Sequence, residues 1–354
     1  MREDFPVLEK YTYLNTASCG LLSNSLVQWR RRQDEQLLEG GSVFRDKHKE
    51  HLSSIRKTVA TFFGAGIRET ALVPNFSFGL NTFIESLGKK QKVLLLTNEY
   101  PSVSWAFLTK DFEVCYALIT QDLENNIEQA VEKHRPTIFA FSLVQYLNGI
   151  KIDIDFLKRL KAYHPDLLLV ADGTQYLGTE VFNFSESPLD ALGCSAYKWL
   201  ISGYGNGFFL VKESLHNKLH PTTIGFNSAE TFDTRREDVS FIKHFEPGHQ
   251  DTLNYGSLEQ SLLKLNELGM ETISSKLKEL INYSKEAFTE KGLLEDSILH
   301  RDNHSSIFNI KGDASVFQKL KENNIICSLR GSGIRVSMHY YNTKEDLDKL
   351  LSLV

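Results

Sequence analysis

Short runs of consecutive apolar residues alternate along the chain with segments in which apolar residues recur every three or four positions. The apolar runs occupy residues 92–97, 137–144, 167–171 and 189–192. Between the second and third runs, residues 153–163 carry Ile154, Leu157 and Leu160 at helical spacing. Strands that are apolar throughout are buried on both faces. The alternation therefore predicts a three-layer α/β/α domain around a mainly parallel sheet.

The pattern changes after about residue 247. Residues 257–283 predict one long helix, because Leu258, Leu262, Leu265 and Leu268 lie on one face. Short strands are expected at 306–310, 325–329 and 334–338, and helices at 314–322 and 344–353. These elements predict a smaller C-terminal α/β domain. We expect an N-terminal arm (1–20) packing with the small domain, a large domain (21–255) and the small domain (256–354).

Bulk properties narrow the possible partners. At 354 residues the chain exceeds the size of most single cores, and its net charge of −5 argues against a nucleic-acid partner. Four scattered cysteines, without a CxxC pair, argue against a disulfide scaffold and a structural zinc site, so no metal is expected. The chain starts without a signal-peptide pattern and lacks a membrane-length apolar run. We expect a soluble cytoplasmic protein.

The most informative residues are Asp172 and Lys198. Ligands of parallel sheets bind beyond the carboxyl ends of the strands, and Asp172 follows the apolar run 167–171 directly. Lys198 follows the next apolar run, among small and polar residues. Alone, the aspartate could be a turn residue and the lysine a surface residue. Together they suit pyridoxal 5′-phosphate (PLP), which takes a lysine on its aldehyde and an acid on its ring nitrogen.

A candidate phosphate cradle lies at residues 73–81. Pro74 and Asn75 break a strand, and Ser77 is expected to cap a helix running to Leu87. Free N–H groups and the positive dipole end at a helix N-terminus suit a phosphate, although ordinary capping explains the segment equally well. Ser195 could donate to the same phosphate.

Two further residues could serve the same site. Tyr100 follows the 92–97 strand and could stack on a flat cofactor ring, or be a core tyrosine. Arg335 stands in the apolar stretch 334–338, where a buried guanidinium needs an anion. A substrate carboxylate and a protein carboxylate satisfy that need equally well on local grounds.

Taken together, these residues resemble the class V aminotransferase family. The resemblance runs nearly end to end, through the segments at residues 13–20, 172–175, 195–199, 335–337 and 341–343. It implies the fold-type I architecture of PLP-dependent enzymes. It also implies an amino acid substrate and a homodimer with active sites at the subunit interface.

The resemblance also implies roles for individual residues. Lys198 and Asp172 become catalytic, as the Schiff-base lysine and the partner of the pyridinium. Gln175 contacts the cofactor's phenolic oxygen or the lysine, and Gln145 contacts the ring, unless Asn148 takes that place. The remaining expected cofactor contacts are Asn75, Phe76, Ser77, Tyr100, Ser195 and Tyr197. Substrate contacts are expected from Arg335 and Asn15.

The chain departs from the family pattern in two places. Many relatives carry histidine where Tyr100 and Tyr197 stand, and neither tyrosine can act as an imidazole acid. The glycine–threonine step with which relatives reach the neighbouring subunit's phosphate reads Gly-His-Gln-Asp-Thr here. His249, Gln250 and Thr252 are all candidates for that contact.

The reaction is less constrained than the cofactor. Cysteine desulfurases of the family need a nucleophilic cysteine on a mobile loop before the substrate arginine. Cys327 instead falls inside the expected strand 325–329 and reads as a buried structural residue. We therefore expect an aminotransferase-like enzyme. A desulfurase or selenocysteine-lyase-like activity without a loop cysteine, an epimerase, and a non-catalytic PLP-binding protein are the alternatives. Arg330 binds either a second acidic group or a surface carboxylate.

Overall fold

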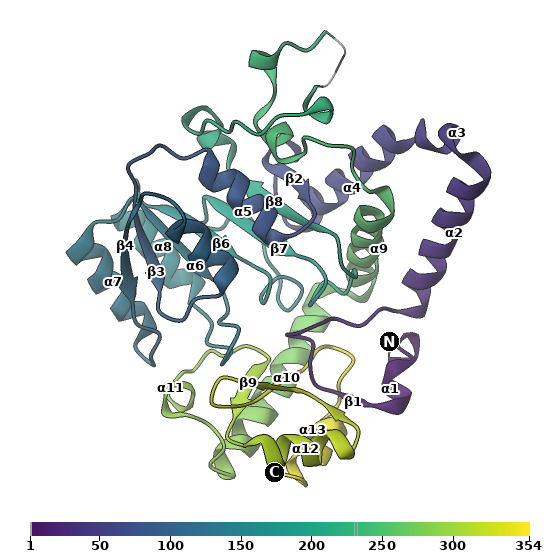
Figure 1. The fold of residues 1–354 in the computed structure, drawn as a ribbon. Helices are drawn as coiled ribbons and strands as arrows, with labels where there is room; N and C mark the ends of the chain where they lie inside the picture. The colour runs from purple at the N-terminus through teal and green to yellow at the C-terminus, as the bar shows by residue number, and fades with distance from the viewer. Residues whose placement is uncertain (1, 230, 232) are drawn as a thin grey trace.

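A seven-stranded sheet forms the centre of the larger part of the protein (Figure 1). The computed structural model describes residues 2–229, 231 and 233–354. The strand order is β2-β8-β7-β6-β5-β3-β4, and β8 runs antiparallel to both of its neighbours. The strands are β2 (Thr70–Val73), β3 (Lys92–Leu96), β4 (Glu113–Ala117), β5 (Ile138–Ser142), β6 (Leu168–Asp172), β7 (Ala191–Ser195) and β8 (Gly207–Val211).

Alternate residues of each strand enter two separate hydrophobic cores. On β3, Val93 and Leu95 belong to one core, whereas Leu94 and Leu96 belong to the other. The first core is closed by α5 (Phe76–Glu85) and α6 (Pro101–Leu108). The helices on the opposite face are α4 (His48–Phe62), α7 (Leu123–His134), α8 (Ile154–Tyr163) and α9 (Thr252–Leu268). The predicted three-layer α/β/α fold is therefore confirmed.

The C-terminal region forms a smaller α/β unit, at the bottom of Figure 1. Its antiparallel sheet has the order β11-β12-β9. The elements are β9 (Ile307–Ile310), β10 (Ile325–Ile326), β11 (Ser328–Arg330), β12 (Gly333–Ser337), α10 (Met270–Glu290), α11 (Asp296–Leu299), α12 (Ala314–Glu322) and α13 (Lys344–Leu351).

The N-terminal arm lies against this smaller unit. β1 (Thr12–Tyr13) pairs in parallel with β10, and Arg2 forms an ion pair with Asp346 on α13. Asn15 forms a β-bridge with Ser337 at the end of β12. The arm at residues 1–20 as a separate unit stays a prediction. The remaining N-terminal elements are η1 (Arg2–Asp4), α1 (Val7–Lys10), α2 (Asn24–Gly40), α3 (Ser42–Arg45) and η2 (Ile67–Glu69).

The single helix expected at 257–283 is wrong. Gly269 has φ +82°, a backbone conformation that side chains other than glycine's rarely adopt, and it separates α9 from α10. α9 packs against α2 and α4, whereas α10 packs against α9 and α13. The predicted division at 255/256 falls within α9, and the change of packing partner comes at Gly269. The two-domain division itself stays a prediction.

The strand expected at 325–329 is likewise two strands. β10 pairs with the N-terminal arm and β11 pairs with β12, so the chain changes partner at Cys327. The two strands are separated only by Cys327, and no glycine or proline in this stretch marks the change of partner.

The stretch expected to be the most loop-like, residues 214–238, contains short 3-10 helices, and part of it lies outside the described residues. The 3-10 helices in and directly after this stretch are η3 (Glu213–Lys218), η4 (Phe226–Ser228), η5 (Arg236–Asp238) and η6 (Phe241–Phe245). Across the described parts of the chain, none of the helices combines the length and apolarity needed to cross a bilayer.

The carboxyl ends of the central strands meet at one edge of the sheet. Ser142 at the end of β5 is in register with Asp172 at the end of β6, which in turn pairs with Gly193 on β7. Ser195 ends β7 two residues further along. This register brings polar residues that are distant in sequence to one place.

Candidate active site

A cavity of about 170 Å³ opens at this edge of the sheet. Nine of the predicted site residues line it: Asn75, Phe76, Ser77, Tyr100, Asp172, Gln175, Ser195, Tyr197 and Lys198. Its other lining residues are Ser102, Ser142, Val144, Tyr146 and Thr174. Of these, Thr174 stood within a recognised motif without an assigned role, whereas nothing local distinguished Ser102 or Tyr146 from ordinary loop residues.

One end of the cavity is built from hydroxyl groups and helix N-termini. Asn75, and not Ser77 as expected, caps α5, because its side chain accepts a hydrogen bond from the Phe78 amide. The Ser77 hydroxyl is thereby left to point elsewhere, and it donates to Ser102 in the first turn of α6 (2.9 Å). Ser195 accepts from the Phe76 amide (2.9 Å), which leaves its own proton available to a ligand. This end suits an anion.

Lys198 also lines this cavity and is buried. Its Nζ stands 5.6 Å from the centre of the Tyr100 ring and 5.5 Å from that of Tyr197. Within the described residues, no carboxylate forms an ion pair with it. Burial lowers the pKa of Lys198 to about 8, although the charge of Asp172 opposes this shift. Roughly a tenth of the amine is therefore neutral, and nucleophilic, at pH 7, far more than for an ordinary lysine.

The N-terminal arm closes over this lysine. The Gly20 amide donates to the Tyr197 carbonyl (2.9 Å). A Cβ at Gly20 would lie 2.0 Å from the Lys198 carbonyl oxygen, so only glycine allows the two backbones to approach this closely. The position of Lys198 thus depends on a segment far away in sequence.

Asp172 is buried, and Thr174 of its own turn interacts with its carboxylate. Its Oδ1 accepts from the Thr174 amide (2.8 Å). Burial raises the pKa of Asp172, and the Thr174 side chain, the Thr174 amide and the charge of Lys198 oppose the rise. A buried carboxylate with so few partners favours a cationic or N–H group placed beside it.

Gln175 is fixed from both sides. Its Oε1 accepts from the Trp199 indole (2.8 Å), and its Nε2 donates to the Ala17 carbonyl in the arm (3.0 Å). One amide hydrogen remains for a ligand in the cavity.

Glu99 is a buried acid to which the sequence reasoning assigned no role. It accepts hydrogen bonds from the Tyr100 amide (2.7 Å), the Ser142 amide (2.9 Å) and the Ser142 hydroxyl (2.6 Å). Burial raises its pKa and these hydrogen bonds lower it. Glu99 ties the end of β3 to the end of β5, and so fixes the backbone of Tyr100.

Gln145, Asn148 and Asn15 are not among the residues that line the cavity. The Gln145 amide reaches toward Glu99 (3.4 Å), Asn148 accepts from the Ile150 amide, and Asn15 accepts from the Ser328 hydroxyl. Tyr146, between the first two, contributes to the wall instead, with its ring 5.0 Å from that of Tyr100.

Arg335 lies beside the cavity and is almost fully buried. Its Nη1 donates to the Tyr146 carbonyl (2.6 Å) and its Nη2 to the Ser18 hydroxyl (2.7 Å). Its Nε finds no hydrogen-bond partner, and it forms no ion pair with a described carboxylate. Burial lowers the pKa of Arg335 to about 10. The alternative of a protein salt bridge is not supported, and an anion from outside would satisfy the group.

The three candidates for a contact across a subunit boundary differ in their surroundings. Gln250 donates to the Leu72 carbonyl (3.0 Å), and Thr252 begins α9 within reach of His48 (3.4 Å). His249 is exposed, with its ring stacked on that of Phe226.

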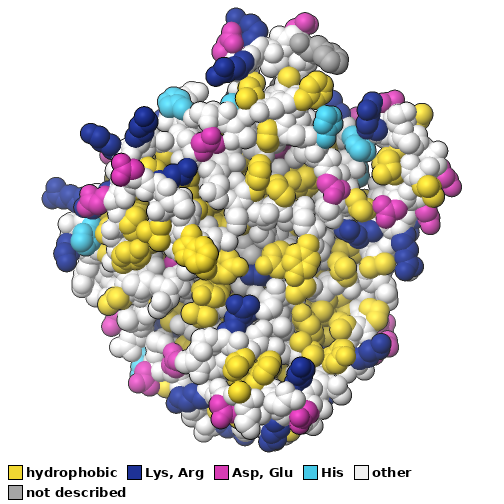
Figure 2. Space-filling view, in the orientation of Figure 1, with side chains coloured by type: hydrophobic (Ala, Val, Ile, Leu, Met, Phe, Trp, Pro, Cys, Tyr) yellow, Lys and Arg dark blue, Asp and Glu magenta, His cyan; other side chains and the backbone are white. Residues whose placement is uncertain are grey.

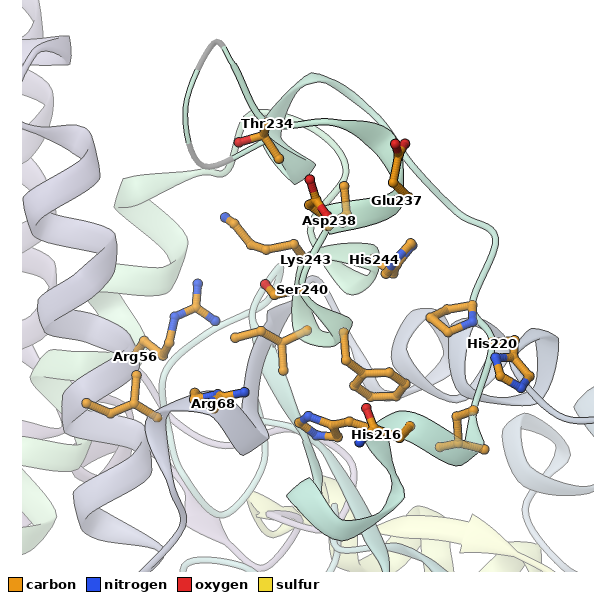
Figure 3. A pocket seen from close by; sticks show the side chains of 17 residues that line it. Arg56, Arg68, His216, His220, Thr234, Glu237, Asp238, Ser240, Lys243 and His244 are labelled. Atoms are coloured by element: carbon orange, nitrogen blue, oxygen red, sulfur yellow. The ribbon is translucent and has the colours of Figure 1, made fainter.

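A larger cavity, of about 1120 Å³, lies elsewhere, between η2, η3, η5 and η6 (Figure 3). Its charged groups are paired within the protein: Arg56 and Lys243 with Glu246, and Arg68 with Glu213. Figure 3 shows its labelled side chains spread along the walls. Size alone does not make it the better site, because the convergent, unpaired groups lie around Lys198.

The profile of the "aminotransferase class-V" family matches residues 35–350. An uncharacterized aminotransferase YcbU of Bacillus subtilis (strain 168) is 25% identical over 98% of this chain and 94% of that protein. A probable cysteine desulfurase of Borreliella burgdorferi is 19% identical over 99% of this chain and 94% of that protein. The solved cystine C-S lyase C-DES, in complex with its product cysteine persulfide, shares the fold with a TM-score of 0.88, at 17% identity over 98% of both chains.

The chain belongs to the class V aminotransferase family, whose members depend on PLP. The donor set of the cavity fits that cofactor. It offers hydroxyls and a helix N-terminus for a phosphate, a buried amine for an aldehyde, and a buried carboxylate for a ring nitrogen. Nine of the residues recognised from sequence thus share this cavity, whereas Gln145, Asn15 and Arg335 do not line it.

The environment of Lys198 predicts its reactivity in the cofactor-free protein. Only a neutral amine reacts with acetic anhydride, and burial lowers the pKa of Lys198 to about 8. We expect half-maximal acetylation near pH 8, measured by peptide mass spectrometry. An ordinary lysine requires about pH 10.4. Exposed Lys90 serves as the internal reference. A midpoint for Lys198 above about pH 10 would contradict its burial.

Proposed function

We propose that this protein is a PLP-dependent enzyme that acts on an amino acid and that its activity is aminotransferase-like. The observation that carries the proposal is the buried Lys198 amine, which lines the same cavity as Asp172 and the hydroxyl groups at the N-terminus of α5. When bound, PLP supplies an electron sink that stabilises negative charge at the substrate's α-carbon. The protein's own groups hold the reactants and move protons.

In this proposal the phosphate binds among Ser77, Ser195 and the N-terminus of α5. Asp172 holds the ring nitrogen in its protonated form, because that N–H group provides the buried carboxylate with a charged partner. Tyr100 and Tyr197 flank the lysine, and Tyr100 is well placed to stack on the ring. Gln175 contributes its remaining amide hydrogen.

Lys198 has two roles in the proposed cycle. Its amine would hold the cofactor, and it would also accept and return the α-proton of the substrate. Both roles need the neutral amine, and a pKa of about 8 makes that form far more accessible than in an ordinary lysine. Arg335 binds the substrate carboxylate through its planar guanidinium group. The Tyr146 carbonyl and the Ser18 hydroxyl already orient this group.

We also propose a cytoplasmic homodimer with the active sites at the subunit interface. Large apolar side chains are exposed around the cavity, among them Trp105 (66%) and Tyr204 (62%), the latter stacked on Tyr197. Figure 2 shows hydrophobic side chains gathered across the middle of this face. A surface of this kind favours burial against a second copy. Of the three candidates for the contact across the boundary, exposed His249 is the one free to reach a partner's cofactor.

A carbon–sulfur cleaving activity is the second candidate, because relatives include a probable cysteine desulfurase. Against a mechanism that stores sulfur on Cys327, this residue lies between β10 and β11, and burial raises the pKa of its thiol to about 12. A thiol that is protonated at neutral pH is a poor nucleophile.

The proposal predicts the behaviour of Lys198→Ala. The purified protein should be yellow, and borohydride should fix the cofactor on Lys198, as seen by peptide mass spectrometry. Lys198→Ala should still bind PLP through its phosphate contacts but lose turnover by about a thousandfold or more, as for a group both nucleophile and base. Protein that takes up no PLP, or full activity of the variant, would refute the proposal.

The second candidate predicts a different result with cysteine. If the protein is aminotransferase-like, incubation with cysteine should release little sulfide. Sulfide and keto-acid product are measured in the same reaction and compared. Cys327→Ala should leave both quantities unchanged within about twofold, since a buried thiol of this kind is inert. Sulfide release that is fast in the wild type and persists in Cys327→Ala would favour lyase chemistry without a loop cysteine.

The proposed interface predicts complementation between two inactive variants. Lys198→Ala and His249→Ala homodimers should each lack a competent site. In a mixed dimer, one site takes intact Lys198 from one subunit and intact His249 from the other. An equimolar, exchanged mixture should regain about a quarter of the wild-type rate of turnover of an amino acid. If His249 serves its own subunit, or the protein is a monomer in sedimentation, no recovery will occur.

A further inference from the structure

Two arginines project from one face of the small sheet. Ser328 on β11 lies opposite Arg335 on β12, and Arg330 follows Ser328 by two positions. Side chains two positions apart on a strand share a face, so Arg330 lies on the same face as Arg335. The two are diagonal neighbours, with backbones roughly 7–8 Å apart.

The backbone around Arg330 is fixed by Asn309, which lies opposite Arg335 on β9. The Asn309 amide donates to the Arg330 carbonyl (2.9 Å) and reaches the Leu147 carbonyl (3.3 Å). Arg330 thus occupies a defined place against the loop that carries Tyr146, although its side chain is exposed.

An open cavity of about 710 Å³ extends beside this arginine. Tyr146 lines both this cavity and the one that contains Lys198, so the two adjoin. Leu147 and Phe317 add apolar surface to the lining of this cavity. A cavity that combines apolar surface with a charged group suits a ligand with an aliphatic part and an anionic end.

Positive charge in this region lacks matching negative charge. Arg330, like Arg335 and Lys198, forms no ion pair with any carboxylate in the described ranges. Glu295, which lies next to the β11–β12 turn, accepts a hydrogen bond from Ser332. The charge of Arg330 also lowers the pKa values of Lys198 and Arg335, which places all three groups within one electrostatic environment.

We propose that Arg330 binds a second anionic group, on the substrate's side chain, while Arg335 holds the α-carboxylate. The substrates are then α-amino acids with an acidic side chain, either a carboxylate or a sulfonate. This inference rests on the proposed function and specifies its substrate class. Two guanidinium groups on one face match the two anions of such a molecule.

The test compares acidic amino acids with their neutral isosteres on the PLP-loaded enzyme. Aspartate, glutamate and cysteate, together with asparagine and glutamine, are titrated and followed by the spectrum of the bound cofactor. In wild type, at least one acidic ligand should bind about tenfold or more tightly than the amides. In Arg330→Gln this preference should disappear, with the dissociation constants of the amides unchanged within about twofold.

Arg159→Gln is the matched control, because it removes an exposed arginine from α8 and changes the net charge equally. It should keep the wild-type preference, and Arg330→Lys should keep part of it. Calorimetric titration of PLP-loaded Lys198→Ala with the same ligands measures binding without turnover and should rank them in the same order.

The outcomes separate this inference from the function on which it rests. Protein that takes up no PLP overturns both, whereas a PLP-loaded enzyme whose cofactor spectrum responds to none of these ligands overturns the second anion site alone. A wild-type enzyme that binds the amides as tightly as the acids overturns the second anion site alone. An Arg330→Gln variant that binds acids and amides more weakly by the same factor also overturns it. In that case Arg330 would support the fold of the site and would not distinguish acidic from neutral side chains.

Discussion

The burial of Lys198 beside Asp172 is the constraint on which the rest of the site depends. Removing an amine and a carboxylate from water costs free energy. Burial lowers the pKa of Lys198 and raises the pKa of Asp172, and the charge of each group opposes the shift of the other. The protein accepts this cost at the carboxyl edge of a rigid sheet, where neither group can relax toward solvent. A cofactor with an electrophilic carbon and a basic nitrogen relieves both.

The sheet supplies that rigidity, and the two ends of the chain complete it. Parallel strands in register bring Ser142, Asp172 and Ser195 to one edge. The N-terminal arm then passes over Lys198, held by Gln175 and by the close approach at Gly20. Because the arm also pairs with β10, it links the cofactor cavity to the small unit that carries the arginines.

The sequence predicted the main architecture and most of the cavity. Apolar runs of strand length, separated by amphipathic helices, have few other solutions than a covered parallel sheet. The sequence-based prediction was wrong at two places where the chain changes its packing or pairing partner within what reads as one element. Gly269 divides two helices inside one apolar pattern, and Cys327 divides two strands inside another. The cap of α5 was misassigned because Asn75 and Ser77 are both residue types that cap helices well. The position at which the backbone enters the helix decides between them, and that position is Asn75.

The sequence by itself determined the family, the cofactor class and the residues at both ends of the cavity, because these follow from residue types in a fixed order. Tertiary structure decided which neighbours share their space. It brought Tyr146 into the wall in place of Gln145, gave Glu99 its anchoring role, and left Arg335 without an ion pair to any carboxylate among the described residues. It also turned Arg330 toward the face of Arg335. Such relations depend on strand register and on contacts between distant segments, which no local pattern of residues encodes.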